Sequence, residues 1–365
     1  MAETPTVERT ALSPASCFTL LALVLLGTRF VQGFIFWGGA SRRLIYDVHE
    51  VDAVKFAVKL DFDSAGFVAN KLTHALPGSL WVQAPLEWML QHPSLIIVSV
   101  WVWTFTELAV GLGLIFGLAT RLAALVSIGL NIALMLIFGW MGSTCLDEWT
   151  MAVSGVAMSS AVFLAGGGAW SLDSLIGRTE WAERNGWAAW AFSGSLPPAS
   201  IKPLGLFLAA VAVVFTVGSY GILFGAVVSP LHARVDFHRH DVVLSEVAVS
   251  ADGAVTFEAY VDAGPDTGAA YIIAARLVDK SGATVAEWNG TTLAALPPTA
   301  IHNVYPYVWA SHFKTEKIGF SGQTGARATI TLPPPEVTTA GGGMPHEIIL
   351  EAINGITWQA KTQPR

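Results

Sequence analysis

A short polar turn between two long apolar stretches holds the residues of this sequence that are best suited to chemistry. The stretch FGWMGSTCLDEWTMA (residues 138–152) places Cys145, Asp147 and Glu148 close together. A cysteine thiolate is a strong nucleophile, and a neighbouring carboxylate can accept a proton. The alternative is structural, because a lone cysteine is commonly a small buried residue and acids suit the first turn of a helix. We interpret all three as candidate catalytic residues.

Long apolar stretches must position this turn at a membrane. The chain has 365 residues, of which 53% are hydrophobic and 13% charged, whereas soluble proteins carry about 25% charged residues. Spanning helices are predicted for residues 17–40, 94–119, 122–141, 151–170 and 204–228. Each stretch is long enough to cross roughly 30 Å of hydrocarbon. We therefore predict an α-helical membrane bundle of four spans plus a fifth.

The basic residues of the short loops favour a cytoplasmic N-terminus. In this orientation the turn at 142–150, which has no lysine or arginine, lies outside together with the loop 41–93. That loop is an exception, because it carries five basic residues beside six acids. Its stretch 62–81 mixes apolar and polar residues at helical spacing, which predicts a short interfacial helix. Cys17 and Cys145 fall on opposite sides, so we expect no disulfide between them.

After residue 228 the sequence changes to short β-type runs separated by Gly, Asp, Pro and Ser. This pattern predicts an all-β antiparallel sandwich. The predicted domains are a four-helix membrane domain (1–190), a linker with the fifth helix (191–230) and an extracytoplasmic β-sandwich (231–365). The net charge of -7 gives no electrostatic footprint for nucleic acid.

Two stretches of the β-rich part remain ambiguous. The aromatic stretch IHNVYPYVWASHFKTEK (301–317) is predicted to pack on the membrane surface, although His302, His312 and Lys314 are alternative cationic contacts for a substrate. The DFHRH run (236–240) is interpreted as a solvated linker rather than a metal site.

Polar residues inside the predicted spans form a second candidate site. A lone charge at the bilayer centre costs at least about 2.5–3.5 kcal/mol, so such residues usually face partners. Arg29 and Glu107 lie near the middle of antiparallel neighbours, which predicts an ion pair, with Asn131 or Gln32 bonding the spare donors. The pair either fixes helix register alone or forms a site for a quinone head group and its protons.

Several motifs resemble a known family. GTRFVQGFIFWGG (27–39) and TELAVGLGLIFGLATRLAA (106–124) are similar to the DoxX-like membrane family. KLTHALPGSLW (71–81) and GWMGSTCLDEWTM (139–151) resemble DoxD, the membrane subunit of thiosulfate:quinone oxidoreductase. The part after the fifth span resembles DoxA, the other subunit. The order of the two parts in one chain indicates a DoxD–DoxA fusion.

The resemblance implies that thiosulfate is oxidised to tetrathionate while a membrane quinone, the co-substrate, takes the electrons without metal, flavin or haem. It also implies a multi-pass protein of the cell (inner) membrane, surrounded by the lipid bilayer, and we expect a homo-oligomer. A non-catalytic scaffold that docks another oxidoreductase is the alternative. A sulfur-anion transporter is disfavoured, because no repeat is visible.

The candidate site residues follow from this combined reading. We assign Cys145, Asp147, Glu148 and Glu107 to catalysis, Arg29, Arg42, Arg43 and His92 to substrate binding, and Trp37, Trp140, Gln32 and Asn131 to quinone binding. Arginine suits thiosulfate because it attracts anions. Trp140 and Trp149 are alternatively plain anchors at the membrane interface.

Overall fold

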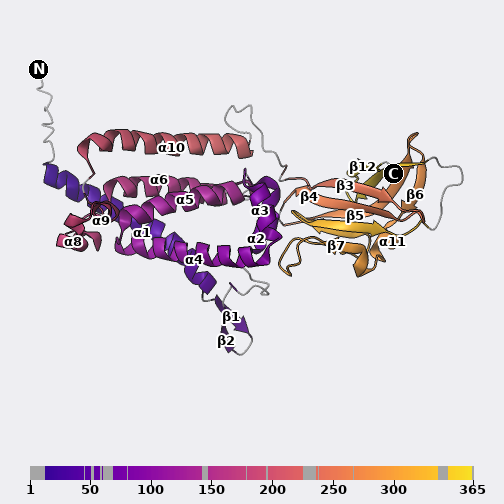
Figure 1. Cartoon of the computed structure of the whole chain (residues 1–365), viewed down its shortest axis with the longest axis horizontal. Coiled ribbons are helices and arrows are strands. Elements are labelled where there is room, and N and C mark those ends of the chain that lie inside the picture. The colour runs from indigo at the N-terminus through magenta and orange to yellow at the C-terminus, as the bar shows by residue number, and fades with distance from the viewer. Residues whose placement is uncertain are drawn as a thin grey trace, which may run out of the picture. The chain divides into compact units, whose positions relative to one another are not determined.

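Five long helices dominate the first 224 residues of the computed structural model (Figure 1). The structure describes residues 13–44, 46–50, 53–57, 60, 69–79, 81–141, 147–177, 179–194, 196–224, 236, 238–265, 267–335 and 344–363. The long helices are α1 (Pro14–Leu44), α4 (Pro93–Phe116), α5 (Thr120–Phe138), α6 (Asp147–Ala165) and α10 (Pro198–Phe224). All five are long and apolar enough to cross a membrane, which confirms the predicted membrane protein.

Glycines set how the first spanning helices pack. Gly117, with a φ of +65°, begins the short connection from α4 to α5. A glycine readily adopts this left-handed conformation after a helix. Where α1 crosses α4, a side chain on Gly33 would lie 2.9 Å from the carbonyl oxygen of Gly111. The two backbones therefore approach closely, and only glycine is accommodated there.

The chain folds into two units, of which the first contains Met1–Arg42, Trp103–Ile132 and Val153–Phe215. Its short helices are α7 (Asp173–Ile176), α8 (Glu180–Arg184) and α9 (Gly186–Ala191). Its buried apolar core is formed by Phe36, Val110, Leu114, Ala123, Ala124, Ile128, Leu130, Val162, Phe163 and Leu208. These side chains come from four spanning helices and from α10, so the first unit is held together by helix packing.

The second unit contains Arg43–Val102, Ala133–Ala152 and Thr216–Arg365. Its helical part has a hairpin of β1 (Tyr46–Glu50) and β2 (Ala53–Ala57), then α2 (Asn70–Ala75), η1 (Leu76–Gly78), α3 (Gln83–Leu90) and η2 (Gly139–Met141). Leu76, Leu86 and Leu90 are buried against the β-rich part rather than exposed to lipid. The predicted interfacial helix is therefore a pair of short helices with a protein-facing apolar side.

The β-rich part is a sandwich of two antiparallel sheets, as the sequence predicted. One sheet has the order β3 (Asp241–Val249), β4 (Val255–Ala263), β10 (Arg327–Leu332) and β7 (Ile301–Asn303). The other has the order β12 (Thr357–Lys361), β11 (Pro345–Ala352), β5 (Ala269–Asp279), β9 (Phe320–Gln323) and β8 (Phe313–Thr315), with β6 (Thr284–Trp288) also on β5. Buried side chains from both sheets, such as Phe257 and Ile348, share one core.

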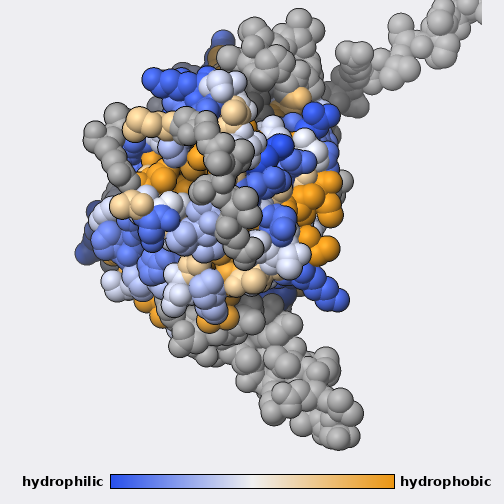
Figure 2. Space-filling view, turned by 90° about the vertical axis from the view of Figure 1, so that its right-hand side faces the viewer, coloured by the Kyte–Doolittle hydropathy of each residue, from blue (hydrophilic) through white to orange (hydrophobic). Residues whose placement is uncertain are grey.

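Short elements complete the sandwich. Asn289 caps α11 (Gly290–Ala294), because its side chain accepts hydrogen bonds from the backbone N–H groups of Thr291 and Thr292. A single turn, η3 (Pro298–Ala300), leads into β7. Figure 2 shows that one end face of the molecule is largely hydrophilic, with smaller apolar patches. Such a surface suits contact with water. The helices α1 and α10, in contrast, expose leucine and phenylalanine side chains.

Candidate functional site

A track of polar side chains crosses the interior of the first unit and joins three spanning helices. Gln32 on α1 donates from Nε2 to Ser127 Oγ on α5 at 3.1 Å, and Ser127 Oγ lies 2.7 Å from Ser159 Oγ on α6. All three side chains are buried. Polar groups in hydrocarbon are expensive unless they are hydrogen-bonded. The track therefore fixes the mutual register of α1, α5 and α6.

Asn131 extends this track by one helical turn. Its Nδ2 donates to the Ser127 carbonyl at 2.8 Å, and the side chain is 2% exposed. The side-chain amide of Asn131 lies against Gly155 of α6, where any side chain would overlap the Asn131 Oδ1 atom. Gly155 therefore leaves room for the amide between two packed helices. Gln32 and Asn131 thus both bond to Ser127, a residue that the sequence analysis did not single out.

Glu107 on α4 is buried at about the same depth as Asn131. It lies ten residues before Gly117, and Asn131 lies eleven residues after Thr120. At 1.5 Å per residue both stand about 15 Å from the α4–α5 turn. Glu107 is 4% exposed, and Thr104 on the same helix face is fully buried.

Two oxygen atoms of this region need hydrogen-bond donors. Within the described part of the chain, Gln32 Oε1 and Thr104 Oγ1 are buried and have no hydrogen-bond partner. Buried acceptors without partners are rare in folded proteins. An amide oxygen and a hydroxyl are the groups that bond the hydroxyls of a quinol or the carbonyls of a quinone. The residues present therefore fit a quinone head group.

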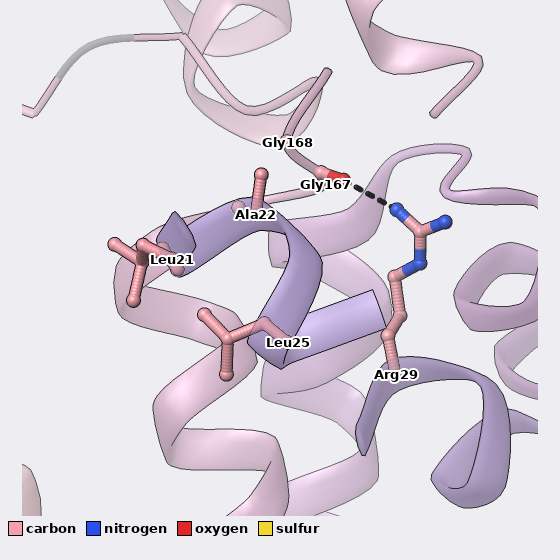
Figure 3. Close-up of a pocket in the computed structure, with 8 residues that line it drawn as sticks. Leu21, Ala22, Leu25, Arg29, Gly167 and Gly168 are labelled. Atoms are coloured by element: carbon pink, nitrogen blue, oxygen red, sulfur yellow. Dashed lines mark hydrogen bonds between the residues drawn. The ribbon is translucent and has the colours of Figure 1, made fainter. Parts of the chain in front are cut away.

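Arg29 lies beside Gly117 at the α4–α5 turn, away from its predicted partner Glu107 in the middle of α4. Figure 3 shows its guanidinium turned toward the loop after α6, where Nη1 donates to the Gly167 carbonyl. Nη2 donates to the Trp170 carbonyl at 2.7 Å. A side chain on Gly117 would collide with this guanidinium, so Arg29 lies at the α4–α5 turn. The predicted Arg29–Glu107 ion pair is wrong, because the two residues are about ten residues apart in depth, or 15 Å.

Asp173 is the carboxylate that faces Arg29, and the sequence did not single it out. Asp173 accepts from the backbone N–H groups of Ala119 (2.7 Å) and Thr120 (2.9 Å) and from Ser193 Oγ (2.5 Å). It therefore caps the first turn of α5, where negative charge is favourable. The sequence signal that could have identified Asp173 is an acidic residue in a short loop directly after a predicted span.

Arg121 stands close to Asp173 and has a similar clamping role. Its Nε donates to the Phe163 carbonyl at 3.0 Å, and Nη1 donates to the Gly194 carbonyl at 2.5 Å. Both acceptors are backbone oxygens near the end of α6 and the segment after α9. Arg29, Arg121 and Asp173 together tie the loops at this end of the first unit.

The two predicted quinone-contacting tryptophans occupy different surroundings. Trp140 is 3% exposed, its Nε1 donates to the Ala75 carbonyl at 2.8 Å, and its ring covers Gly78. Trp37 is 37% exposed, and its ring packs 5.1 Å from that of Phe34. Trp140 thus locks η1 onto the end of α5. Trp37 keeps an accessible ring surface.

The predicted substrate-binding residues Arg42 and Arg43 lie in the last turn of α1, and His92 directly precedes α4. Arg42 is exposed, with its Nε donating to the Gly38 carbonyl at 3.0 Å. Arg43 is half-buried. His92 is exposed, and its Nδ1 lies 2.6 Å from the Trp88 carbonyl while the two rings pack 4.7 Å apart. Arg42 and His92 are therefore more exposed than Arg43.

The turn predicted to be catalytic, residues 142–150, is only partly described. Cys145 lies outside the described residues, and Asp147 begins α6 with a side chain that is not described. Glu148 lies 3.9 Å from Lys71 Nζ on α2, in a half-exposed contact. Trp149 donates from Nε1 to Ser219 Oγ of α10 at 3.0 Å, so it packs α6 on α10 within the second unit. Glu148 is therefore the described member of the turn, and it faces a cation.

Two of the predicted cationic contacts of the β-rich part, His312 and Lys314, have structural partners. His312 Nε2 lies 2.9 Å from the Tyr305 carbonyl, and Lys314 forms an ion pair with Glu316 at 3.3 Å. His302 is exposed on β7. Burial lowers the pKa of His240, at the end of the DFHRH run. Within the described ranges no three His, Cys, Asp or Glu side chains form a metal-binding group.

The fold and this track define a multi-pass membrane protein whose bundle encloses polar groups and whose C-terminal part is a β-sandwich. Residues 24–197 match the family described as TQO small subunit DoxD, and residues 224–361 match the family described as TQO small subunit DoxA. The chain therefore belongs to the DoxD and DoxA families, the subunit families of thiosulfate:quinone oxidoreductase, joined in one polypeptide. No solved structure was found to match the chain.

Proposed function

We propose that this chain oxidises thiosulfate to tetrathionate and passes the electrons to a membrane quinone. The observation that carries the proposal is the buried polar track of Gln32, Ser127 and Asn131, with Glu107 at the same depth, inside a bundle of the DoxD family. Buried ionisable residues within membrane spans usually serve a function. A quinone head group reaches that depth because the molecule dissolves in the bilayer.

The substrate side of the reaction is assigned to Arg42, Arg43 and His92. Arg42 and Arg43 attract the thiosulfate dianion, because a guanidinium donates charge-assisted hydrogen bonds to oxyanions, and His92 adds ring N–H donors. Arg29 is left out of this group, since its guanidinium is engaged by two backbone carbonyls. We also propose that the N-terminus is cytoplasmic, so that the 142–150 turn and the β-sandwich are extracytoplasmic.

The chemistry at the turn proceeds through Cys145. Its thiolate and the outer sulfur of one thiosulfate form an S–S bond, and two electrons leave the pair of sulfurs. The sulfur of a second thiosulfate then attacks the outer sulfur of that adduct. This attack forms tetrathionate and returns the Cys145 thiolate. Asp147 or Glu148 accepts the thiol proton before the first step.

The polar track serves the acceptor side. A quinone supplies the two-electron sink when it is bound, and it takes two protons. Glu107 holds a proton at its carboxyl group, while Gln32 and Asn131 orient the oxygens of the head group by amide hydrogen bonds. Trp37, with its accessible ring, borders the path from the bilayer, and Trp140 holds η1 in place.

An anaerobic assay with the two single-cysteine variants tests this proposal. Purified wild-type chain, Cys145→Ser and Cys17→Ser are mixed with thiosulfate and a short-chain quinone, and quinol absorbance and tetrathionate are measured. Cys17 is exposed and serves as the matched control. We expect activity in the wild type and in Cys17→Ser, and its loss in Cys145→Ser.

The other outcomes are equally informative. Equal turnover in all three proteins supports the oxidoreductase activity but excludes a mechanism through the Cys145 thiolate. No turnover in any of them, with the fold retained, favours the non-catalytic scaffold.

A further inference from the structure

The aromatic side chains of the stretch 301–317 are buried inside the protein. Its residues 305–311, here called the docking segment, include Tyr305, Tyr307 and Trp309, which are 0%, 2% and 7% exposed. They share one core with Leu76 and Leu90 of the η1 and α3 region. The prediction of a membrane-surface loop is therefore wrong, because the rings fill a surface presented by the helical part of the second unit.

Hydrogen bonds fix the docking segment on α2 and α3. Tyr307 Oη donates to the Leu90 carbonyl at the end of α3. The Ser311 N–H donates to Thr73 Oγ1 at 3.1 Å, and both side chains are fully buried. Gly325 has a φ of +80°, and any side chain there would strike the Thr73 carbonyl. The sandwich thus meets α2 backbone to backbone, which requires close shape complementarity.

An ion pair crosses the same contact. Arg327 Nη1 on β10 lies 2.9 Å from Glu87 Oε1 on α3 and 3.5 Å from Glu258 Oε1 on β4. Its guanidinium stacks 4.5 Å above the ring of Tyr260. Burial raises the pKa of Tyr260 and of Tyr305, so both phenols remain protonated. Arg327 therefore bridges a carboxylate of its own sandwich and one of the helical part.

These features are those of the core of a protein–protein interface. Buried tyrosine, tryptophan and arginine dominate binding energy at such cores. The two family matches cover 24–197 and 224–361, and α10 (Pro198–Phe224) lies almost entirely between them. The contact described above joins residues of the first match to residues of the second. It does not depend on α10 or on the chain that follows it.

We propose that the docking segment with Arg327, on one side, and the α2–α3 surface, on the other, form a self-sufficient subunit interface. The DoxA-like part then stays bound to the DoxD-like part when the covalent connection between them is cut. The connection acts as a tether that raises the effective concentration of the sandwich near its site. This inference concerns binding and holds whether or not the chain oxidises thiosulfate.

A cleavage experiment on the full chain tests the proposal. A protease site is placed within residues 225–235, the chain is embedded in lipid nanodiscs, and cleavage is run to completion. Size-exclusion chromatography then follows the released β-sandwich over time. We expect the two fragments to elute together. Separation of the wild-type fragments during the run overturns the proposal.

Three variants identify the contact that holds the fragments. Glu87→Gln removes the α3 partner of Arg327 without changing the sandwich, and Tyr307→Phe removes only one hydroxyl. Each is expected to accelerate dissociation by roughly tenfold, since loss of one member of a buried polar pair acts mainly on the off-rate. Val308→Ala, at a position 75% exposed in the same segment, is the control and leaves the rate unchanged. Unchanged rates in both Glu87→Gln and Tyr307→Phe overturn the assignment.

Discussion

Asp173→Asn is the substitution whose effect the structure specifies most fully. The change keeps the shape of the side chain and removes its charge. Two backbone N–H groups, of Ala119 and Thr120, each donate to a different oxygen of Asp173. An asparagine has one acceptor oxygen, so one of these N–H groups faces an amide NH2. The negative charge beside Arg29 and Arg121 is lost at the same time.

The magnitude follows from these two losses. Removing one partner of a buried charged network costs about 3–5 kcal/mol. This range includes the loss of a helix cap, which by itself costs about 0.5–2 kcal/mol. For chains of 150–250 residues each kcal/mol lowers the melting temperature by about 2–4 °C. We therefore expect the apparent midpoint of Asp173→Asn to fall by roughly 10 °C.

Thermal unfolding of purified protein in detergent, followed by tryptophan fluorescence at a fixed scan rate, measures this effect. Glu180→Gln is the matched control, because its carboxylate is 85% exposed and pairs only with Arg184 on the surface. Surface ion pairs of this kind contribute little. Quinone reduction per folded molecule should be unchanged in Asp173→Asn. A midpoint equal to that of Glu180→Gln would refute the clamping role of Asp173.

Three further predictions follow from the buried groups. Gly155→Ala should destabilise the chain by about 1–3 kcal/mol, since the new methyl group overlaps Asn131; a wild-type melting curve contradicts this packing. Glu107→Gln should lower quinone reduction while preserving the melting temperature; normal turnover with a lower midpoint leaves Glu107 a structural role only. Burial lowers the pKa of His240, so the folded chain binds fewer protons there than the unfolded chain does. Its stabilising contribution is present above the unfolded pKa of about 6.5 and is lost as the pH falls below it. Urea unfolding between pH 8 and pH 5 should show this loss in the wild type and a flatter profile in His240→Gln; parallel profiles contradict it.

Much of the architecture was predictable from the sequence because the bilayer imposes length and polarity on each span. All five predicted spans are helices, and the region of short β-type runs after residue 228 forms antiparallel strands. Arg29, Gln32, Glu107 and Asn131 are all buried, as the cost of polar groups in hydrocarbon requires. Short strands such as β7 and β8 were missed, because three residues carry too little alternation to show a period.

The partners of the buried groups were not predictable for a physical reason. The position of a residue within a predicted span indicates its depth in the bundle only if the helix begins and ends where the pattern indicates. The observed helix α1 extends from Pro14 to Leu44. This length puts Arg29 at the α4–α5 turn. Asp173 looked like an ordinary loop acid, because its function depends on a fold that returns it to α5. The docking segment was misplaced since its partners lie more than 200 residues earlier in the chain.

The clamp around Arg29 has a consequence for biogenesis. Its two acceptor carbonyls belong to residues 138 and 141 positions later in the chain. A ribosome adds about 5–20 residues each second, so α1 emerges on the order of ten seconds before those carbonyls exist. During this interval the guanidinium must reach the headgroups or stay in the insertion machinery. The final depth of the first helix in the membrane is therefore set only after α6 has entered the bilayer. The helix that is synthesised first thus reaches its final position after α6, which is synthesised later.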